Sequence, residues 1–417
     1  MADSFGDDQA LDSSAPRTFA LDDRIETIRD EVPAVRDTVY LNTGTCGPLP
    51  RRAVAAVREA FDTELAHGRI GPTHYPAMAE AVSGVKATVA SVLGCDAEEL
   101  ALTRHTTDGM NIALAGLSWQ PGDEIVVTNI EHPSGLLPSF LARRRYQVVT
   151  RVADIGLGGG PAEEIVAAIE RQITPRTRLI VLSHIPYTTG AVLPLAEISA
   201  MAHGHGVRVL ADAAQSYGQI PLDLHALGVD YYAMPGQKWM CGPEGTGVFY
   251  ARAESLDALE QTFAGPFGMV FGTLDYLGAT YELRAGTGRF DVGSMSLPLL
   301  AGQLAATRWI RDDVGLPAAT QRISQLGRYA AATLGALPGV RIVTPRDRMA
   351  GLIAFEVEGF DPEDLTKRLL AEHNITIRFV DTYINNPRAA RISTGFYNTR
   401  EDIDRLAEAI QTLRRAG

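Results

Sequence analysis

Runs of apolar, strand-forming residues alternate with longer helical patterns between residues 75 and 252, and this alternation restricts the fold more than any other feature. Several runs are hydrophobic without interruption, which is typical of strands buried on both faces of a parallel sheet. The predicted strands are 99–103, 124–129, 147–153, 177–184, 208–214, 230–236 and 245–252. The predicted helices are 75–93, 107–116, 135–145, 161–173 and 194–204. The pattern predicts an α/β fold with a mostly parallel central sheet.

The pattern changes after about residue 295, where long helical stretches dominate over short apolar runs. The expected elements are helices at 296–314, 317–335, 361–373 and 399–415, and strands at 352–359, 375–380 and 389–394. We therefore expect a large domain (37–294) followed by a smaller C-terminal α+β domain (295–417). Residues 1–36 form an N-terminal tail and segment, of which the first 20 are acidic and have no apolar stretch resembling a secretory signal.

Composition excludes several classes of function. Lys and Arg number 38 against 50 Asp and Glu, and the net charge of −12 argues against non-specific binding to nucleic acids or anionic membranes. No stretch approaches the ~18 apolar residues of a membrane span. The three cysteines, Cys46, Cys95 and Cys241, form no Cys-x-x-Cys pair. We therefore expect reduced thiols, no zinc site and a cytoplasmic protein.

The segment 208–250 has the highest density of residues suited to chemistry. Asp212 ends a strongly apolar strand, and ligands of open α/β sheets bind outside the carboxyl ends of strands. Gln215 follows it, and Lys238 comes after the next strand in a turn rich in Gly and Pro. From these residues alone, Asp212 is either a ligand contact or a helix cap, and Lys238 is either a reactive amine or a solvated lysine.

The order Asp-x-x-Gln followed by Gly-x-Lys-x-x-x-Gly-Pro-x-Gly-x-Gly resembles the class V aminotransferase family. This family consists of pyridoxal-phosphate enzymes of fold type I, and the members most similar in pattern are cysteine desulfurases, cysteine C–S lyases and isopenicillin N epimerase-like enzymes. The resemblance covers roughly residues 36–412 and is most specific over 177–250. It implies a fold-type-I enzyme with pyridoxal 5'-phosphate in the large domain.

The resemblance assigns roles around the cofactor ring. Lys238 resembles the lysine that forms the Schiff base with the cofactor, and Asp212 resembles the aspartate that pairs with the ring nitrogen. Gln215 resembles the residue that hydrogen-bonds the phenolic oxygen of the ring. His132 resembles the histidine that stacks on the ring, although a histidine in a loop is more often structural. Lys238 and His132 are therefore the catalytic candidates.

The phosphate group needs several donors, and a helix N-terminus provides them. Thr106 and Thr107 lie between a predicted strand and a predicted helix and resemble the phosphate-binding pair of the family, although their hydroxyls are also ordinary helix caps. Gln237 replaces the histidine that desulfurases usually carry before the lysine. Ser294 resembles a hydroxyl that reaches the phosphate of the neighbouring subunit, which implies a homodimer with shared active sites.

The substrate carboxylate needs a cation with two parallel donors. Residues 391–399 resemble the family pattern Arg-x-Ser-x-x-x-Tyr-Asn-Thr, so Arg391 is the predicted carboxylate-binding arginine. Residues 42–47 resemble the Gly-rich loop that shapes the substrate pocket, which makes Asn42 and Gly44 substrate-binding candidates.

The chain departs from the desulfurases at the residue that accepts sulfur. Desulfurases carry a nucleophilic cysteine shortly before the carboxylate-binding arginine, but residues 379–388 contain none, and Cys46 is the one thiol near the predicted pocket. Residues 183–195 resemble the corresponding stretch of C–S lyases. The predicted reaction is α,β-elimination from a cysteine derivative, which could be a large conjugate. Epimerisation, transamination, decarboxylation and desulfuration remain alternatives, and a ligand-sensing module without activity is the non-enzymatic one.

Overall fold

A computed structural model of the chain describes residues 18–380 and 388–416. Its core is a seven-stranded sheet in the order β2-β8-β7-β6-β5-β3-β4. The strands β3 to β7 run parallel to one another, and β8 lies antiparallel to both of its neighbours. The strands of this sheet are β2 (Leu100–Thr103), β3 (Glu124–Thr128), β4 (Val149–Ala153), β5 (Thr177–Ser183), β6 (Arg208–Asp212), β7 (Tyr231–Pro235) and β8 (Gly247–Ala251).

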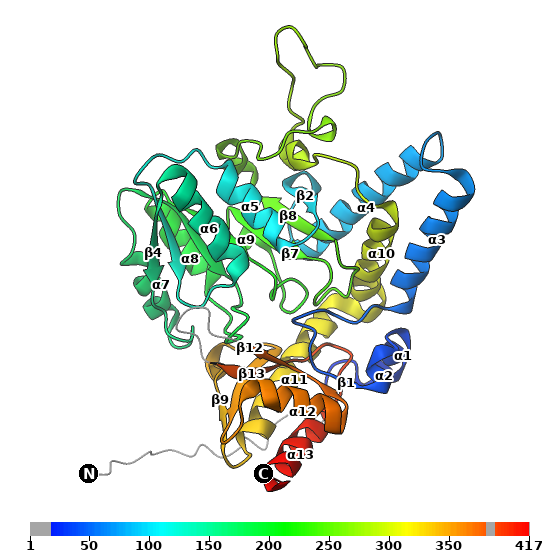
Figure 1. Cartoon of the computed structure of the whole chain (residues 1–417), viewed down its shortest axis with the longest axis vertical. Helices are drawn as coiled ribbons and strands as arrows, with labels where there is room; N and C mark the ends of the chain where they lie inside the picture. Colours follow the sequence, from blue (N-terminus) through cyan, green and yellow to red (C-terminus); the bar gives the residue numbers. More distant parts are fainter. Residues whose placement is uncertain (1–17, 381–387, 417) are drawn as a thin grey trace.

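Every strand predicted between residues 99 and 252 is present in this sheet, slightly shorter than expected. Every residue of β7 and β8 is buried, because helices cover both faces of the sheet (Figure 1). The helices of this part are α3 (Arg51–His67), α4 (His74–Leu93), α5 (Thr106–Gly116), α6 (Pro133–Tyr146), α7 (Ala162–Glu170), α8 (Leu195–Gly204) and α9 (Leu224–Leu227). The fold is therefore α/β with a mostly parallel central sheet, as predicted.

The C-terminal part forms a second layer at the bottom of Figure 1. Its four-stranded antiparallel sheet has the order β12-β13-β10-β9. The elements are β9 (Val340–Ile342), β10 (Leu352–Val357), β12 (Arg378–Val380) and β13 (Ala389–Ser393), with α11 (Leu316–Gly335), α12 (Pro362–His373) and α13 (Arg400–Ala416). The prediction of a single strand at 375–380 is wrong, because the structure has two strands there with different partners. β11 (Ile375–Thr376) pairs with β1 (Val39–Tyr40), whereas β12 pairs with β13 in the C-terminal sheet.

N-terminal segments contact both parts of the molecule. Helices α1 (Ile25–Glu31) and α2 (Ala34–Asp37) lead into β1, and Val39 packs in the C-terminal core. Helix α10 (Leu297–Arg308) packs against α3 and α4, and a π-helical segment (Trp309–Gly315) connects it to α11. The division into domains at residues 294 and 295 remains a prediction.

Local packing brings α5 close to the sheet at the end of β2. A Cβ atom at Gly109 would lie 2.7 Å from the Ala233 Cβ, so a larger residue would push this helix off β7. The N-terminus of α5 is thereby held above the carboxyl ends of the parallel strands. Within the described ranges 18–380 and 388–416, no helix is both long enough and apolar enough to cross a bilayer.

Candidate active site

The predicted site residues gather at the carboxyl edge of the central sheet. Asp212 is the last residue of β6, His132 follows β3, and Lys238 follows β7. Because these strands are parallel members of one sheet, their ends lie on one edge. The charges of Asp212 and Lys238 both shift the pKa of the His132 imidazole.

Asp212 is buried, with 3% of its surface exposed. Its Oδ1 accepts a hydrogen bond from the backbone N–H of Ala214 at 2.9 Å. Its Oδ2 is buried and has no hydrogen-bond partner among the residues that the structure describes. A buried carboxylate oxygen without a donor is costly, so this side of Asp212 is suited to a ligand that carries a proton or a positive charge.

Lys238 lies in the turn between β7 and β8. Desolvation by burial lowers its pKa from 10.5 to about 8, an effect that the carboxylate of Asp212 opposes and the guanidinium of Arg391 reinforces. Residues 42–47 pack directly on this turn, since the Gly47 N–H donates to the Gln237 carbonyl at 2.7 Å. With this pKa, roughly a tenth of the Lys238 amine is neutral at pH 7 and about half at pH 8, and the neutral form is the one that acts as a nucleophile or general base.

His132 has a defined tautomer. The backbone N–H of Ser134 donates to His132 Nδ1 at 3.0 Å, and the Ser134 hydroxyl lies 2.9 Å from the same nitrogen. Burial lowers the pKa of His132, and the Asp212 carboxylate only partly opposes this shift. The ring is therefore neutral at pH 7 and carries its proton on Nε2.

Two helix N-termini meet at one end of the site. Thr106 and Thr107 begin α5, and the Thr107 hydroxyl lies 3.0 Å from the hydroxyl of Ser134 in the first turn of α6. The Gln237 Oε1 atom is buried without a hydrogen-bond partner in the described part of the chain. Backbone N–H groups and hydroxyls at helix N-termini are donors suited to a phosphate group.

Arg391 lies on β13 and is 2% exposed. Its Nη2 donates to Thr45 Oγ1 at 2.9 Å and, with a long bond of 3.4 Å, to Asn42 Oδ1. Its Nη1 donates to the Tyr187 carbonyl at 3.3 Å, and its Nε has no partner among the described residues. Burial lowers the pKa of Arg391, although a guanidinium keeps its proton in proteins. This buried cation is therefore a good site for a carboxylate ligand.

Gln215 is held from two sides by the protein itself. Its Nε2 donates to the Gly44 carbonyl at 2.8 Å, and its Oε1 accepts a hydrogen bond from the Trp239 indole at 3.0 Å. The amide still has a second Nε2 proton, so the predicted contact with a ring oxygen stays a prediction. Asn42 and Gly44 thus both lie in the site, on the loop that contacts Arg391 and Gln215.

Ser294 is the one predicted site residue that the structure leaves at the surface. It is exposed and makes no hydrogen bond to the other predicted site residues within the described part of the chain. Its predicted contact is with a neighbouring subunit, so this position is compatible with that prediction and does not test it.

Two further residues of the site are not among the site residues predicted from the sequence. The Tyr187 ring packs edge-on against His132 with centroids 4.9 Å apart, and its carbonyl contacts Arg391. Arg378 is the register partner of Arg391 on the neighbouring strand, and its charge lowers the pKa values of His132, Lys238 and Arg391. The aromatic residue in 183–195 is a visible signal for Tyr187, whereas Arg378 becomes visible only once the pairing of β12 with β13 is known.

The Cys46 thiol lies beside a carboxylate. Its Sγ is 3.9 Å from Glu244 Oε1, and burial and then the Glu244 charge raise its pKa. A thiol with a raised pKa has little thiolate at neutral pH and is a poor nucleophile. The cysteine-free stretch before Arg391 falls largely on residues 381–387, which lie outside the described residues.

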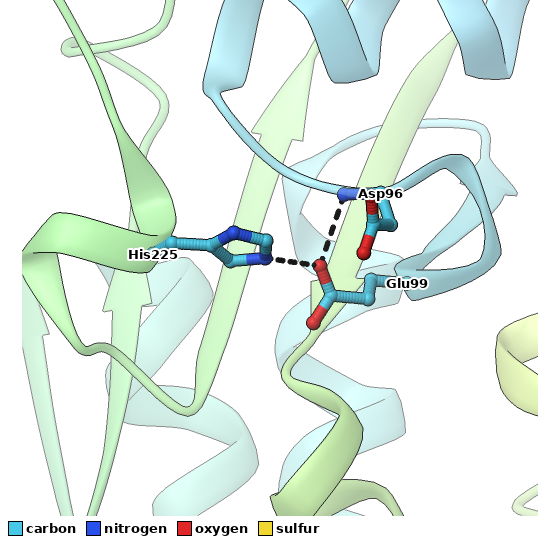
Figure 2. Close-up of side chains that lie close together, drawn as sticks. All are labelled: Asp96, Glu99 and His225. Atoms are coloured by element: carbon cyan, nitrogen blue, oxygen red, sulfur yellow. Dashed lines mark hydrogen bonds and ion pairs between the residues drawn. The ribbon is translucent and has the colours of Figure 1, made fainter.

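Asp96, Glu99 and His225 form a separate group at the amino end of β2 (Figure 2). Because β2 and β7 run in the same direction and Lys238 follows β7, this group lies at the opposite ends of the strands from Lys238. The Glu99 Oε2 atom accepts hydrogen bonds from the Asp96 backbone at 3.0 Å and from His225 Nε2 at 2.7 Å. Asp96 and Glu99 also form a capping box around a short helix. These contacts account for the group as a helix cap and an ion pair.

Comparison with known proteins gives a family match over most of the chain. The family Aminotransferase class-V matches residues 39–406. A probable cysteine desulfurase of Methanothermobacter thermautotrophicus is 29% identical over 403 residues, which cover 94% of this chain and 98% of the relative. A probable cysteine desulfurase 2 of Mycobacterium leprae is 30% identical over 398 residues, covering 89% and 90%.

Solved structures show the same architecture. The cystine C–S lyase C-DES, in complex with its product cysteine persulfide, has a TM-score of 0.84 at 29% identity and covers 91% of this chain and 98% of its own. A C-DES mutant with glycine covalently linked to its pyridoxal-phosphate cofactor has a TM-score of 0.85 at 29% identity, with coverages of 92% and 98%. The chain therefore belongs to the class V aminotransferase family.

Proposed function

We propose that this chain is a pyridoxal-phosphate-dependent lyase that cleaves the C–S bond of a cysteine derivative by α,β-elimination. The observation that carries the cofactor assignment is the buried, unpartnered Oδ2 of Asp212 at the strand edge that also presents Lys238. The likeness to the C–S lyase C-DES and the lack of cysteine in 379–390 support the reaction type.

The residues of the site fit pyridoxal phosphate at four points. Asp212 Oδ2 suits a protonated ring nitrogen, and the amine of Lys238 suits the aldehyde carbon. Thr106 and Thr107, at the N-terminus of α5, offer donors for the phosphate. The neutral ring of His132 suits stacking against a cationic aromatic ring, because it adds no repelling charge. Bound pyridoxal phosphate supplies an electron sink for negative charge at the substrate Cα.

The chain's own residues then divide the remaining work. The guanidinium of Arg391 binds the substrate carboxylate with two parallel N–H groups and so fixes the orientation of Cα. Lys238 Nζ removes the Cα proton, for which a pKa near 8 is well matched. Asp212 keeps its negative charge beside the ring nitrogen while the thiolate leaves from Cβ. Water then hydrolyses the released aminoacrylate to pyruvate and ammonia. Each S-substituted cysteine therefore yields one thiol, one pyruvate and one ammonia.

The reaction is tested with a panel of S-substituted cysteines and cystine, with pyruvate, thiol and alanine measured together. Elimination gives pyruvate and thiol in equal amounts from an S-substituted cysteine, and pyruvate and cysteine persulfide in equal amounts from cystine. Alanine formed with an enzyme persulfide would instead show desulfuration, the activity named for the relatives from Methanothermobacter and Mycobacterium. An inverted Cα without either product would show epimerisation. Sodium borohydride followed by peptide mass spectrometry tests whether the cofactor is fixed on Lys238.

We also propose a homodimer in which each site uses Ser294 of the other subunit. The segment 269–283 projects from the body of the protein (Figure 1). Within it, Met269 pairs with Leu283 and Asp275 pairs with Thr280. It exposes large apolar side chains, with Leu277 fully exposed and Tyr276 87% exposed. A patch of this kind on a soluble chain supports burial against another subunit.

Mixing two inactive variants tests the sharing of sites. In a mixed dimer of Lys238→Ala and Ser294→Asp, shared sites place both changes in one site and leave the other intact, so activity returns. If Ser294 served its own subunit, both sites would stay inactive. Sedimentation that showed a fully active monomer would overturn the dimer. The three unpaired cysteines support a reducing, cytoplasmic location, which cell fractionation tests.

A further inference from the structure

Glu131 is a buried carboxyl group that the proposed chemistry does not use. It stands between β3 and His132 and is 1% exposed. The Ser183 hydroxyl donates to its Oε2 at 2.7 Å, and the Thr128 hydroxyl donates to its Oε1. Thr128 ends β3 and Ser183 ends β5, so the Glu131 carboxyl group connects the ends of two neighbouring strands.

The same strand ends connect Glu131 to Asp212. Ser183 and Asp212 are register partners on β5 and β6, so the three residues form a row along the carboxyl edge of the sheet. Desolvation by burial, with a contribution from the Asp212 charge, raises the pKa of Glu131 from 4.5 to about 7. The titratable neighbours on the flanking segments are His132 and His184, and burial lowers both of their pKa values, so both are neutral near pH 7.

We propose that Glu131 is a positioning residue whose charge sets how strongly Asp212 holds the proton on the cofactor ring nitrogen. This inference rests on the proposed function. When Glu131 is ionised, a second negative charge stands beside Asp212 and stabilises the protonated ring. When Glu131 is protonated, Asp212 acts alone, and the ring nitrogen and the Lys238 amine release their protons at lower pH. At the effective dielectric of about 20 in proteins, one buried charge in this row shifts such a titration by ~1 unit.

The first test uses the cofactor-free protein and urea unfolding between pH 4.5 and 8.5. A carboxyl group whose pKa is raised on folding stabilises the folded state below its unfolded pKa, and this stability is lost as the pH rises through the folded value. The urea midpoint of the wild type, measured relative to that of Glu131→Gln at the same pH, is therefore expected to fall as the pH rises from 4.5 to about 7. His132 and His184, whose pKa values burial lowers, contribute the opposite trend to both proteins alike, so this difference isolates Glu131. Ser183→Ala, which keeps the carboxyl group, is the matched control and retains the fall.

The second test follows the absorbance of the bound cofactor as a function of pH. The pH midpoint of the absorbance change in Glu131→Gln is expected ~1 pH unit below that of the wild type. The midpoint in Ser183→Ala is expected within ~0.3 pH unit of the wild-type value. Equal midpoints in the wild type and Glu131→Gln would overturn the inference and leave the proposed function standing. Equal shifts in both variants would also overturn it, since loss of the hydrogen bond between Ser183 and Glu131 would then explain them without the Glu131 charge. A wild type that binds no pyridoxal phosphate would remove the proposed function and this inference together.

Discussion

Arg391 provides the most direct test of substrate binding. Its guanidinium is buried and forms hydrogen bonds to neutral oxygens of Thr45, Asn42 and Tyr187, with no acidic partner among the described residues. In Arg391→Met the side chain keeps much of its length but loses the charge and the donors. The change therefore removes the proposed carboxylate contact, and the Asp212 and Lys238 contacts to the cofactor remain.

The expected loss follows from the desolvated carboxylate. Removing one partner of a buried, hydrogen-bonded charge pair costs ~3–4 kcal/mol, which corresponds to ~10²–10³-fold in kcat/KM. Arg391→Lys keeps the charge without the fork of donors, so its loss is smaller but still large. The cofactor-free Arg391→Met protein is expected to be as stable as the wild type or more stable by up to ~2 kcal/mol, since a buried cation without an acidic partner disfavours folding.

The assay combines steady-state kinetics on an S-substituted cysteine with the cofactor spectrum and urea unfolding. Arg388 is the matched control. It directly precedes β13, the strand that carries Arg391, and its exposed guanidinium forms an ion pair with Asp361. Arg388→Met should keep kcat/KM within about twofold, because exposed ion pairs contribute little. If Arg391→Met retained a third or more of the wild-type kcat/KM, the carboxylate assignment would be wrong. A lost cofactor spectrum would instead assign Arg391 to the cofactor.

Four further changes test the remaining assignments. Lys238→Ala should abolish turnover and the borohydride-stable cofactor adduct while the fold stays intact by circular dichroism; a variant that kept both would contradict its role. Asp212→Asn should still bind cofactor but slow Cα deuterium exchange by ~10²-fold or more, and a near-normal exchange rate would refute the ring contact. In the cofactor-free protein the Lys238 pKa lies at about 8 instead of 10.5, so stability should rise with pH across that interval in urea unfolding, and Lys238→Met should lack this rise. Joint replacement of Cys46, Cys95 and Cys241 by serine should keep most activity and cost ~1 kcal/mol for each buried thiol, whereas loss of turnover with a normal cofactor spectrum would reveal a covalent sulfur step.

The parallel sheet is predictable because each of its strands has a local signature. The segments 177–184 and 208–214 contain the uninterrupted apolar runs 179–182 and 209–211, and such runs are typical of a strand covered on both faces. The positions of Asp212 and Lys238 follow, since each comes directly after such a run. Residues that follow strand ends can thus be located from the sequence without knowing how the strands pair.

Residues whose role depends on pairing cannot be found this way. The run 375–380 looks like one strand, yet its first half pairs with β1 and its second half with β13. No local pattern records that change of partner, and it is this change that places Arg378 beside Arg391. Glu131 is similar, because its neighbours Ser183 and Asp212 come together only through the order of β3, β5 and β6.

The distinction between elimination and desulfuration depends on whether a sulfur acceptor stands near the substrate. The cofactor contacts of Asp212 and Lys238 serve either reaction, so they do not discriminate between them. A desulfurase needs a thiolate that attacks the substrate sulfur, and the residues 379–390 before Arg391 contain no cysteine. Cys46 lies on the pocket loop, but burial and Glu244 raise its pKa and hold it as a thiol. Without a nucleophile to accept sulfur, the electrons released at Cα leave by expelling the substrate thiolate from Cβ, which is the outcome of a lyase.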